Sequence, residues 1–435
     1  MTTRSTTRAL AHLYRRAGFG ATQAEIDAAA KLGFDAAVEK LLAGLSEKDV
    51  SGDALKLPPL TPLAQSSIPG FTYNDYNEFI ALSTWWLDRM VVTDTPLREK
   101  LVLLLHEQFP TSYAKVGYAD LMYNQNEIFR TLGQGPFDVL TQAVSKDPAM
   151  LIWLDTGTDL KAHPNENFAR ELMERFTMGI GTYSEHDVRE AARAFSGWSL
   201  DYFSGEFFFN IYDHDNGEKR YLGRTGRFQG EDIINIATHT DDSARWVVSR
   251  FWSWLAYPVT PKDPVVSDLA RGYKKDRNMT NLLGAIFRHP RFLSSKSMNG
   301  LIKQPVEFLV GTLRLLGLTT QAYPEGDFVY QLSGLGQQPF VPFNVGGWGQ
   351  NQYWLSTSAS NSQLGLAWSV AQYADLAAVA DLNGNPGAQV DLVTKMLAIE
   401  AWSPRTYSAL WKLADKGSPQ ELLVLALVSP EYLMN

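Results

Sequence analysis

Residues 78–93, EFIALSTWWLDRMVVT, and residues 96–112, PLREKLVLLLHEQFPTS, follow each other with only two residues between them. Their apolar residues recur at three- and four-residue spacings, which is the period of one face of an α-helix. Pro96 stands at the start of the second segment, and proline is well tolerated in the first turn of a helix. The two segments therefore predict a pair of helices joined by a tight turn.

The same spacing continues through most of the chain, and strand-like alternation is rare. One exception is residues 201–228, DYFSGEFFFNIYDHDNGEKRYLGRTGRF, where alternating aromatic residues and then Asp-Asn-Gly predict a β-hairpin or an ordered loop. Another is the irregular stretch 340–361, FVPFNVGGWGQNQYWLSTSASN. We expect a mainly α, large multi-helix globular fold with a small β-hairpin insertion and long Gly/Asn/Trp-rich loops.

The chain has no clean linker and no internal repeat, so we expect one large helical unit over residues 1–435. Closely packed parts within it are expected, because 435 residues are many for one compact core. A subdivision would give an N-terminal helical part (1–160), a motif-bearing part with the hairpin insertion near 201–228 (161–320), and a C-terminal loop with helices (321–435).

Composition excludes several classes of function. The net charge is −8 and no long basic run occurs, so nucleic acid is not expected as a partner. The absence of cysteine excludes disulfides, thiolate nucleophiles and cysteine-ligated metals. The longest apolar runs, such as residues 101–105, are too short for a membrane span. Arg15 and Arg16 resemble a twin-arginine export signal, but Glu25 and Asp27 interrupt the apolar region that should follow, so a cytoplasmic location is the default.

Residues 163–176, HPNENFARELMERF, concentrate charged side chains on one helix. On a helical wheel the apolar residues form one arc and the charged residues the other. Glu166 and Arg170, like Glu171 and Arg175, are four residues apart, a spacing at which exposed ion pairs stabilise a helix by a few tenths of a kcal/mol. By pattern alone this is an ordinary amphipathic helix, and a catalytic role stays open beside that interpretation.

Three histidines are candidate acid/base or metal-binding groups. His106 follows five apolar residues, His214 lies between two aspartates, and His239 precedes a predicted helix start. A core histidine, an Asp-rich turn and a helix cap are the alternative explanations. A metal site made of these histidines and a carboxylate is an open alternative, although their spacing gives it no direct support. The common metalloprotease, nucleophile-elbow and nucleotide-binding motifs are absent.

Several segments, in chain order, resemble the bacterial family called domain of unknown function 1800. They are HLYRRAGFGAT, PAMLIWLD, HPNENFARELMERFTMGIGTYSEHDVREAARAFSGW, DHDNGEKRYLG, AIFRHPRF, KQPVEFLVGTLRLLG and PFNVGGWGQNQYW. The family carries no settled activity. The resemblance implies that the following positions belong to family motifs: Arg15, Arg16, Asn165, Glu166, Asn167, Arg170, Glu171, Asp187, Trp198, His214, Asp215, Lys219, His239, Asn344 and Trp348.

The resemblance also implies a buried polar network around Glu166, Arg170 and Glu171. Members of the family are often accompanied by a second family that carries twin-arginine signals, so co-export with such a partner protein is expected as an alternative to a cytoplasmic location. The chain departs from the family at LLLHEQFPTS, where similar proteins show Trp-His and His-Phe.

Our leading hypothesis is a hydrolase that acts by acid/base chemistry on a glycan or another polyhydroxylated substrate, with no cofactor specified. The predicted catalytic residues are Glu166, Arg170, Glu171, His214, Asp215 and His239. The predicted substrate-binding residues are Asn165, Asn167, Trp198, Asn344, Trp348 and Trp354. Two glutamates five residues apart lie about 140° apart on a helix, so one of them would need a partner such as Asp155 or Asp215.

Two alternatives compete with the hydrolase. One is a metal-dependent enzyme that uses His106, His214 and His239. The other is a non-catalytic helical partner or assembly protein for a secreted protein.

Overall fold

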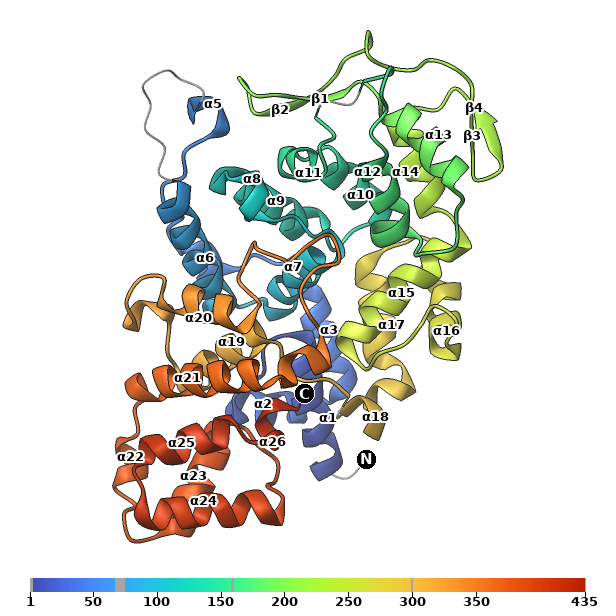
Figure 1. Cartoon of the computed structure of the whole chain (residues 1–435). Helices are drawn as coiled ribbons and strands as arrows, with labels where there is room; N and C mark the ends of the chain where they lie inside the picture. The colour runs from blue at the N-terminus through green and yellow to red at the C-terminus, as the bar shows by residue number, and fades with distance from the viewer. Residues whose placement is uncertain (1–2, 67–74, 158–159, 299, 435) are drawn as a thin grey trace.

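The central helix pair lies where the sequence predicts it. The computed structural model describes residues 3–66, 75–157, 160–298 and 300–434 (Figure 1). In it, α6 (Asp75–Val92) and α7 (Pro96–Gln108) pack against each other, and Pro96 occupies the first turn of α7. Almost every residue of α7 from Leu97 onward is buried, including its polar ones. A helix buried on all sides forms the centre of a helical fold rather than its surface.

The remaining elements confirm a mainly α fold. The N-terminal part contains α1 (Thr3–Ala17), α2 (Gln23–Leu32), α3 (Phe34–Ala43), α4 (Val50–Asp53), α5 (Leu63–Ser66), α8 (Tyr113–Val116), α9 (Ala119–Leu132), α10 (Phe137–Ser145) and α11 (Pro148–Trp153). The middle part contains α12 (Glu166–Glu171), η1 (Leu172–Thr177), α13 (Glu185–Phe195), α14 (Gly230–Thr238), α15 (Asp241–Leu255), α16 (Pro264–Tyr273), α17 (Met279–Arg288), η2 (Pro290–Leu293) and α18 (Ser295–Met298). The C-terminal part contains α19 (Pro305–Leu316), η3 (Thr320–Ala322), α20 (Asp327–Leu335), η4 (Asn351–Leu355), α21 (Thr357–Tyr373), α22 (Ala377–Ala380), α23 (Pro386–Met396), α24 (Pro404–Lys416), α25 (Pro419–Leu427) and α26 (Pro430–Leu433).

Two short antiparallel hairpins interrupt the helices between α13 and α14. Strand β1 (Trp198–Asp201) pairs with β2 (Glu206–Phe209), and β3 (Lys219–Tyr221) pairs with β4 (Arg224–Gly226). Figure 1 shows both hairpins at one edge of the helical body. The sequence predicts one β-hairpin or an ordered loop here, and the structure has two small hairpins.

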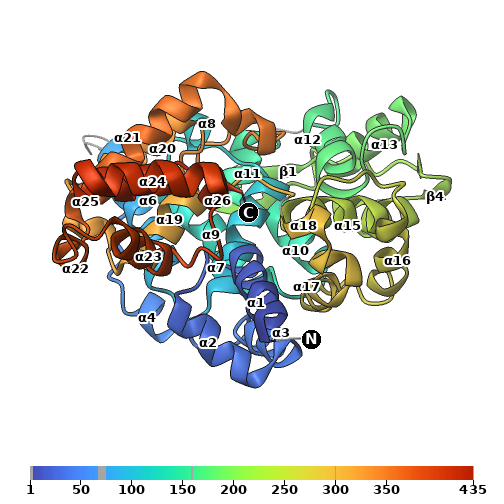
Figure 2. The same cartoon turned by 90° about the horizontal axis from the view of Figure 1, so that it is seen from below.

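One continuous cluster of buried apolar side chains runs through the described part of the chain, from α1 to α26. Figure 2 shows the helices of both chain ends, α1 and α26, close to each other. The long loop between α20 and η4 runs past α7 (Figure 1). No helix in the described ranges is both long and apolar enough to cross a membrane.

The polar side chains of α7 matter for function because a buried polar group needs a partner. Glu99, Lys100, His106, Glu107 and Gln108 all lie inside the protein. Each of them contacts a polar group of another part of the chain. Three clusters of polar side chains that include or lie near these residues are described below.

Candidate functional site

The start of α12 is fastened to the end of α11 by two asparagines. The Asn165 side chain accepts a hydrogen bond from the Asn167 backbone N–H (2.8 Å), as an N-cap does. It also donates to the carbonyl oxygens of Leu154 (3.1 Å) and Asp155 (2.9 Å). Asn167 makes a longer bond, 3.4 Å, to the Leu154 carbonyl. These contacts give both asparagines, predicted to bind substrate, a role in positioning α12.

The predicted buried network around Glu166 and Arg170 is an ion-pair cluster at the surface instead. Both side chains are about one-third or more exposed. Arg170 binds Glu185 through two hydrogen bonds of 2.7 Å each and approaches Glu166 at 3.3 Å. Exposed pairs of this kind contribute little to stability. The expectation of burial is therefore wrong for Glu166 and Arg170.

Glu171 differs from both because it ends α12 where the helix changes type. Residues Leu172–Thr177 form a π-helix, in which the Thr177 hydroxyl donates to the Leu172 carbonyl at 2.6 Å. π-Helical turns are rare and occur frequently at functional sites. Two contacts accompany this turn: Gln108 of α7 donates to the Phe176 carbonyl (2.6 Å), and Trp246 of α15 donates to the Arg175 carbonyl (2.8 Å).

Glu171 and Glu174, which we call the carboxylate pair, lie on either side of Arg175. The Glu174 carboxylate is 3.3 Å from Arg175 and accepts a hydrogen bond from the Tyr183 hydroxyl at 3.0 Å. The Glu171 carboxylate lies 4.0 Å from the Arg175 Nε, too far for a hydrogen bond. The Glu171 Oε2 and the Arg175 Nε are both buried, and neither has a hydrogen-bond partner among the described residues.

The two carboxylates have different environments. The side chain of Glu171 is only 13% exposed. Its pKa is raised by burial first and by the charge of Glu174 second, while Arg175 and Arg170 oppose the shift. Glu174 has a stabilising partner on each oxygen, Arg175 and Tyr183. Two adjacent carboxyl groups in unlike environments are how proteins separate a proton donor from a proton acceptor.

Arg250 of α15 extends the site toward α7. It donates to the Glu107 carbonyl (3.0 Å), and its guanidinium lies over the rings of Trp254 (4.6 Å) and Trp246 (5.7 Å). Burial, and then the nearby charge of Arg175, lower the pKa of Arg250, whereas Glu107 raises it. The Arg250 Nε is buried without a hydrogen-bond partner in the described structure. We define the π-helix site as Glu171, Glu174, Arg175, Trp246 and Arg250.

Glu107 holds the glycine-rich loop beside this site. Its two carboxylate oxygens accept hydrogen bonds from the Trp348 backbone N–H (2.9 Å) and the Gln350 side chain (2.7 Å). Gly347 has a φ of +89°, and a Cβ there would lie 2.7 Å from the Glu107 carboxylate, so only glycine fits. Burial raises the pKa of Glu107 to about 7, against the opposing effects of Arg250 and these two hydrogen bonds.

The three histidines do not meet. His106 is buried beside Asn126 (3.0 Å), and burial lowers its pKa to about 3, so it is neutral. His214 bonds to the Ser196 carbonyl at 2.8 Å, and His239 bonds to the Asn235 carbonyl at 2.9 Å. Within the described ranges, no group of three or more His, Asp or Glu side chains could hold a metal ion. The metal-site hypothesis therefore finds no support in this arrangement.

The other predicted residues also serve local structure. Asp215 binds Arg193 (2.7 Å) beside the hairpins, away from the carboxylate pair. Trp198, Trp348 and Trp354 are buried, so they cannot offer their faces to a substrate as predicted. Asn344 is exposed and accepts a hydrogen bond from the Gly346 backbone at 2.7 Å. The indole of the π-helix site that does reach the surface is that of the partly exposed Trp246.

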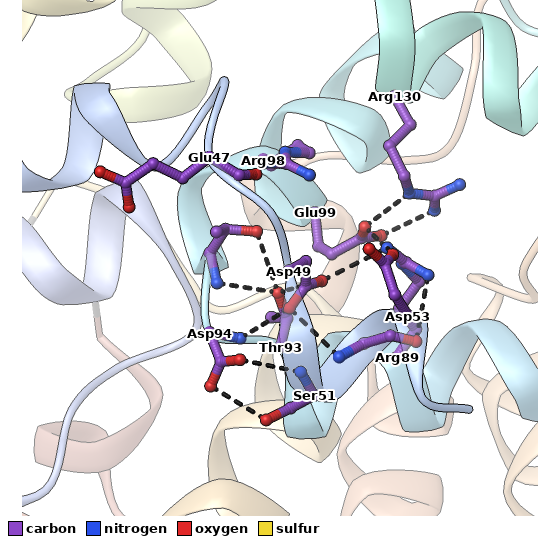
Figure 3. Close-up of polar contacts among 12 residues, drawn as sticks. Glu47, Asp49, Ser51, Asp53, Arg89, Thr93, Asp94, Arg98, Glu99 and Arg130 are labelled. Atoms are coloured by element: carbon purple, nitrogen blue, oxygen red, sulfur yellow. Dashed lines mark hydrogen bonds and ion pairs between the residues drawn. The ribbon is translucent and has the colours of Figure 1, made fainter.

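In a second buried cluster, around Glu99, the charged groups are paired with one another. Figure 3 shows Arg89 of α6 and Arg130 of α9 converging on Glu99 of α7. Glu99 accepts from Arg89 (3.0 Å), twice from Arg130 (2.6 and 2.8 Å) and from Trp86 (3.2 Å). Despite the opposing effect of burial, these cations lower its pKa to about 2. We call Glu99, Arg89, Arg130 and Asp49 the Glu99 network.

Asp49 completes this network from the N-cap of α4. It accepts hydrogen bonds from the Thr93 hydroxyl (2.8 Å) and the Asp94 backbone (2.9 Å), and it pairs with Arg89 at 3.4 Å (Figure 3). The charged groups of the network satisfy one another, which is the arrangement expected of a structural cluster.

Sequence reasoning missed Glu107, Glu174, Arg175, Trp246 and Arg250. The wheel grouped Glu174 and Arg175 with the other charged residues of this helix, and the family motifs include neither of them. Arg250 and Trp246 lie some seventy residues from the π-helix, and no local pattern connects them. The pKa of Glu107 is raised because this residue is buried. The five apolar residues 101–105 predict burial for His106, and that prediction was not extended to its neighbour Glu107.

Comparison with known proteins gives one match. A family model described as "Protein of unknown function (DUF1800)" covers residues 12–434, nearly the whole chain. No curated protein and no solved structure matches the chain.

Proposed function

We propose that this chain, which belongs to the DUF1800 family of proteins of unknown function, is a hydrolase that uses the carboxylate pair for acid/base chemistry. The observation that carries the proposal is the unequal environment of Glu171 and Glu174 on either side of Arg175. A poorly solvated carboxyl with a raised pKa holds its proton more tightly than an ordinary glutamate and is suited to donate it. A carboxylate whose two oxygens are each held by a partner is suited to accept one.

In this proposal Glu171 protonates the leaving oxygen of the bond that breaks. Glu174 takes a proton from the attacking water, and the water oxygen forms the new bond. Arg175 and Arg250, each with a buried Nε that lacks a hydrogen-bond partner in the described chain, would bind oxygen atoms of the substrate. The net reaction adds one water and returns both carboxyl groups to their starting state after proton exchange with solvent.

The substrate class follows from the surroundings of the pair. Glycoside hydrolysis uses two carboxyl groups, one as proton donor and the other as base or nucleophile, and the chain contains no cysteine nucleophile. Trp246 is partly exposed, its indole N–H is bound to the Arg175 carbonyl, and the Arg250 guanidinium lies over its ring, so the exposed part of the ring is what a substrate can contact. These features support a glycan or another polyhydroxylated substrate.

The test is the release of reducing ends from a panel of α- and β-linked polysaccharides by purified protein. We expect Glu171→Gln and Glu174→Gln to lower the rate by about a hundredfold or more. Glu166→Gln is the matched control, because Glu166 is partly exposed on the same helix, is not one of the carboxylate pair, and should retain activity. The proposal fails if wild-type protein releases reducing ends from no member of the panel, or if Glu171→Gln is as active as wild type.

One observation favours a second candidate, a partner-binding role. Around the β1–β2 hairpin, Phe203 and Tyr212 are each 83% exposed, and Tyr202, Phe208 and Ile211 are also exposed. Exposed apolar groups of this size mark interaction sites. The partner proposed here is the twin-arginine-exported protein that the family resemblance implies. Co-purification from the native cell tests it: Phe203→Ser/Tyr212→Ser should lose the partner, whereas Glu171→Gln should retain it.

A further inference from the structure

A third polar cluster lies where the two ends of the described chain meet, away from the π-helix site. Arg15 of α1, Lys303 just before α19, and Glu431 and Tyr432 of α26 line a small cavity there. Figure 2 shows α1 and α26 at this place. The Ile302–Met434 bridge and the bond from the Lys303 N–H to the Leu433 carbonyl (2.9 Å) hold α26 against the start of α19.

Lys303 is buried and forms no ion pair with a described residue, although Glu307 lines the same cavity. Lys303 is only 9% exposed, and its side-chain nitrogen lies 3.3 Å from the centre of the Tyr432 ring. No hydrogen bond or ion pair of the Lys303 ammonium is found in the described ranges. Burial, and then the charge of Arg15, hold the pKa of Lys303 well below its ordinary range. A buried amine of this kind is costly unless something binds it.

Arg15 also has a side-chain donor that no described residue binds. Its Nε is buried and has no hydrogen-bond partner within the described chain. Burial lowers the pKa of Arg15 to about 10, and only the more distant Glu400 opposes this shift. Two basic side chains thus face one cavity, with donors that no described residue binds.

The carboxylates around the cavity are already engaged. Glu307 pairs with Lys100 of α7 and accepts from the Gln304 backbone (3.1 Å). Glu431 accepts from the Ser403 backbone (2.9 Å) and the Thr406 hydroxyl (3.0 Å). Glu400, at the mouth, pairs with Arg8 at 3.2 Å. The donors of Lys303 and Arg15 are therefore left for a group from outside.

Size and charge define that group. The cavity has a volume of ≈ 30 Å³, room for one or two water-sized groups. It adjoins an open pocket of ≈ 450 Å³, with which it shares Arg15, Ala398, Ile399 and Glu431. The small cavity thus suits the oxygens of one acidic group, and the larger pocket suits the body of the molecule. Glu400 and Glu431 at the mouth disfavour multiply charged anions.

We propose that Arg15 and Lys303 form a binding site for the carboxylate of a small organic acid, whose body occupies the adjoining pocket. Planar carboxylates match the fork of an arginine, and an ammonium adds a second charge-assisted hydrogen bond. The site is independent of the carboxylate pair, so either can exist without the other.

Isothermal titration calorimetry at constant ionic strength tests the site, with acetate, hexanoate, benzoate and inorganic phosphate as probes. We expect saturable binding of hexanoate or benzoate that is tighter than binding of acetate, because only the larger acids fill the open pocket. Lys303→Met should weaken it at least about tenfold. Arg271→Gln, a change of an exposed cation on α16 that lines neither cavity, is the control and should alter binding less than about threefold.

A second measurement uses wild-type protein, so it does not depend on whether the variant folds. Reductive methylation followed by mass spectrometry should show Lys303 protected by hexanoate in proportion to occupancy. Absence of saturable binding by all three carboxylates, or unchanged labelling of Lys303 at high hexanoate, would overturn the proposal. Phosphate binding as tight as that of hexanoate would overturn the assignment to a carboxylate.

Discussion

The Glu99 network and the π-helix site are made of the same residue types and differ in how completely these are paired. Glu99 lies between two arginines and accepts four hydrogen bonds. Glu171 lies 4.0 Å from one arginine and has a buried oxygen without a hydrogen bond in the described structure. The pKa of Glu99 is accordingly lowered to about 2, whereas that of Glu171 is raised. Complete pairing is typical of a structural cluster, and the incomplete pairing of Glu171 is what supports the proposed acid/base role.

The largest effect on the free energy of unfolding is expected when the central carboxylate of the Glu99 network is removed. Glu99→Gln removes the shared carboxylate and leaves Arg89 and Arg130 buried without it, which should lower the free energy of unfolding by about 3–5 kcal/mol. Urea denaturation followed by circular dichroism measures this. A loss below about 1 kcal/mol would mean that the Glu99 network is not a structural cluster.

The next largest effect, on the pH dependence of stability, is expected at Glu107, a buried carboxyl of α7. Its pKa is about 7 in the folded chain. Because the folded chain binds this proton more readily than the unfolded chain, stability should fall as pH rises from the ordinary glutamate value to about 7. One such group contributes about 1.4 kcal/mol per pH unit within that window.

Glu107→Gln should remove that contribution, as thermal unfolding across this pH range would show. Some slope should remain, because burial also raises the pKa of Asp147 to about 7. Glu166→Gln, at the surface, should leave the slope of wild type. An unchanged slope in Glu107→Gln would show that Glu107 does not carry a raised pKa.

A smaller effect is expected from the cap that positions the π-helix site. Asn165→Ala removes the N-cap bond and the two bonds to the end of α11, which should destabilise the protein by about 1–2 kcal/mol. If this cap also orients Glu171, activity should fall more than stability alone explains. Activity measured well below the unfolding temperature separates the two effects, and a fall in stability alone would limit Asn165 to a structural role.

The smallest effect on stability is expected at Glu171 itself. Glu171→Gln removes a poorly paired carboxyl group and keeps the shape of the side chain, so the free energy of unfolding should change by less than about 1 kcal/mol. Comparison with Glu99→Gln in the same urea experiment tests the contrast directly. Equal destabilisation by the two substitutions would remove the distinction between the clusters.

The fold was largely predictable because its determinants are local. The apolar spacing and Pro96 gave the central helix pair, and the aromatic alternation after residue 200 gave strand structure. The Thr22–Glu25 and Ser184–Asp187 capping boxes also form as their spacing indicates.

The site was only partly predictable because its determinants are not local. Glu171 was identified, but the π-helix is accompanied by contacts from Gln108 and Trp246, which lie more than sixty residues away in sequence. The wheel placed Glu174 on the same charged arc as Glu171, and the family resemblance then favoured Glu166 over Glu174. Tryptophans chosen as stacking surfaces for their aromatic character are core residues, and burial of a single tryptophan is not readable from composition.

The most direct test of the account is a titration of the Glu171 carboxyl by carbon-13 NMR on glutamate-labelled protein, with Glu171→Gln identifying the signal. The account predicts a pKa above the ordinary glutamate value in wild type and a lower pKa in Glu174→Gln, because that variant removes a neighbouring like charge. A Glu171 that titrates at or below the ordinary value, unaffected by Glu174→Gln, would contradict the assignment of the carboxylate pair.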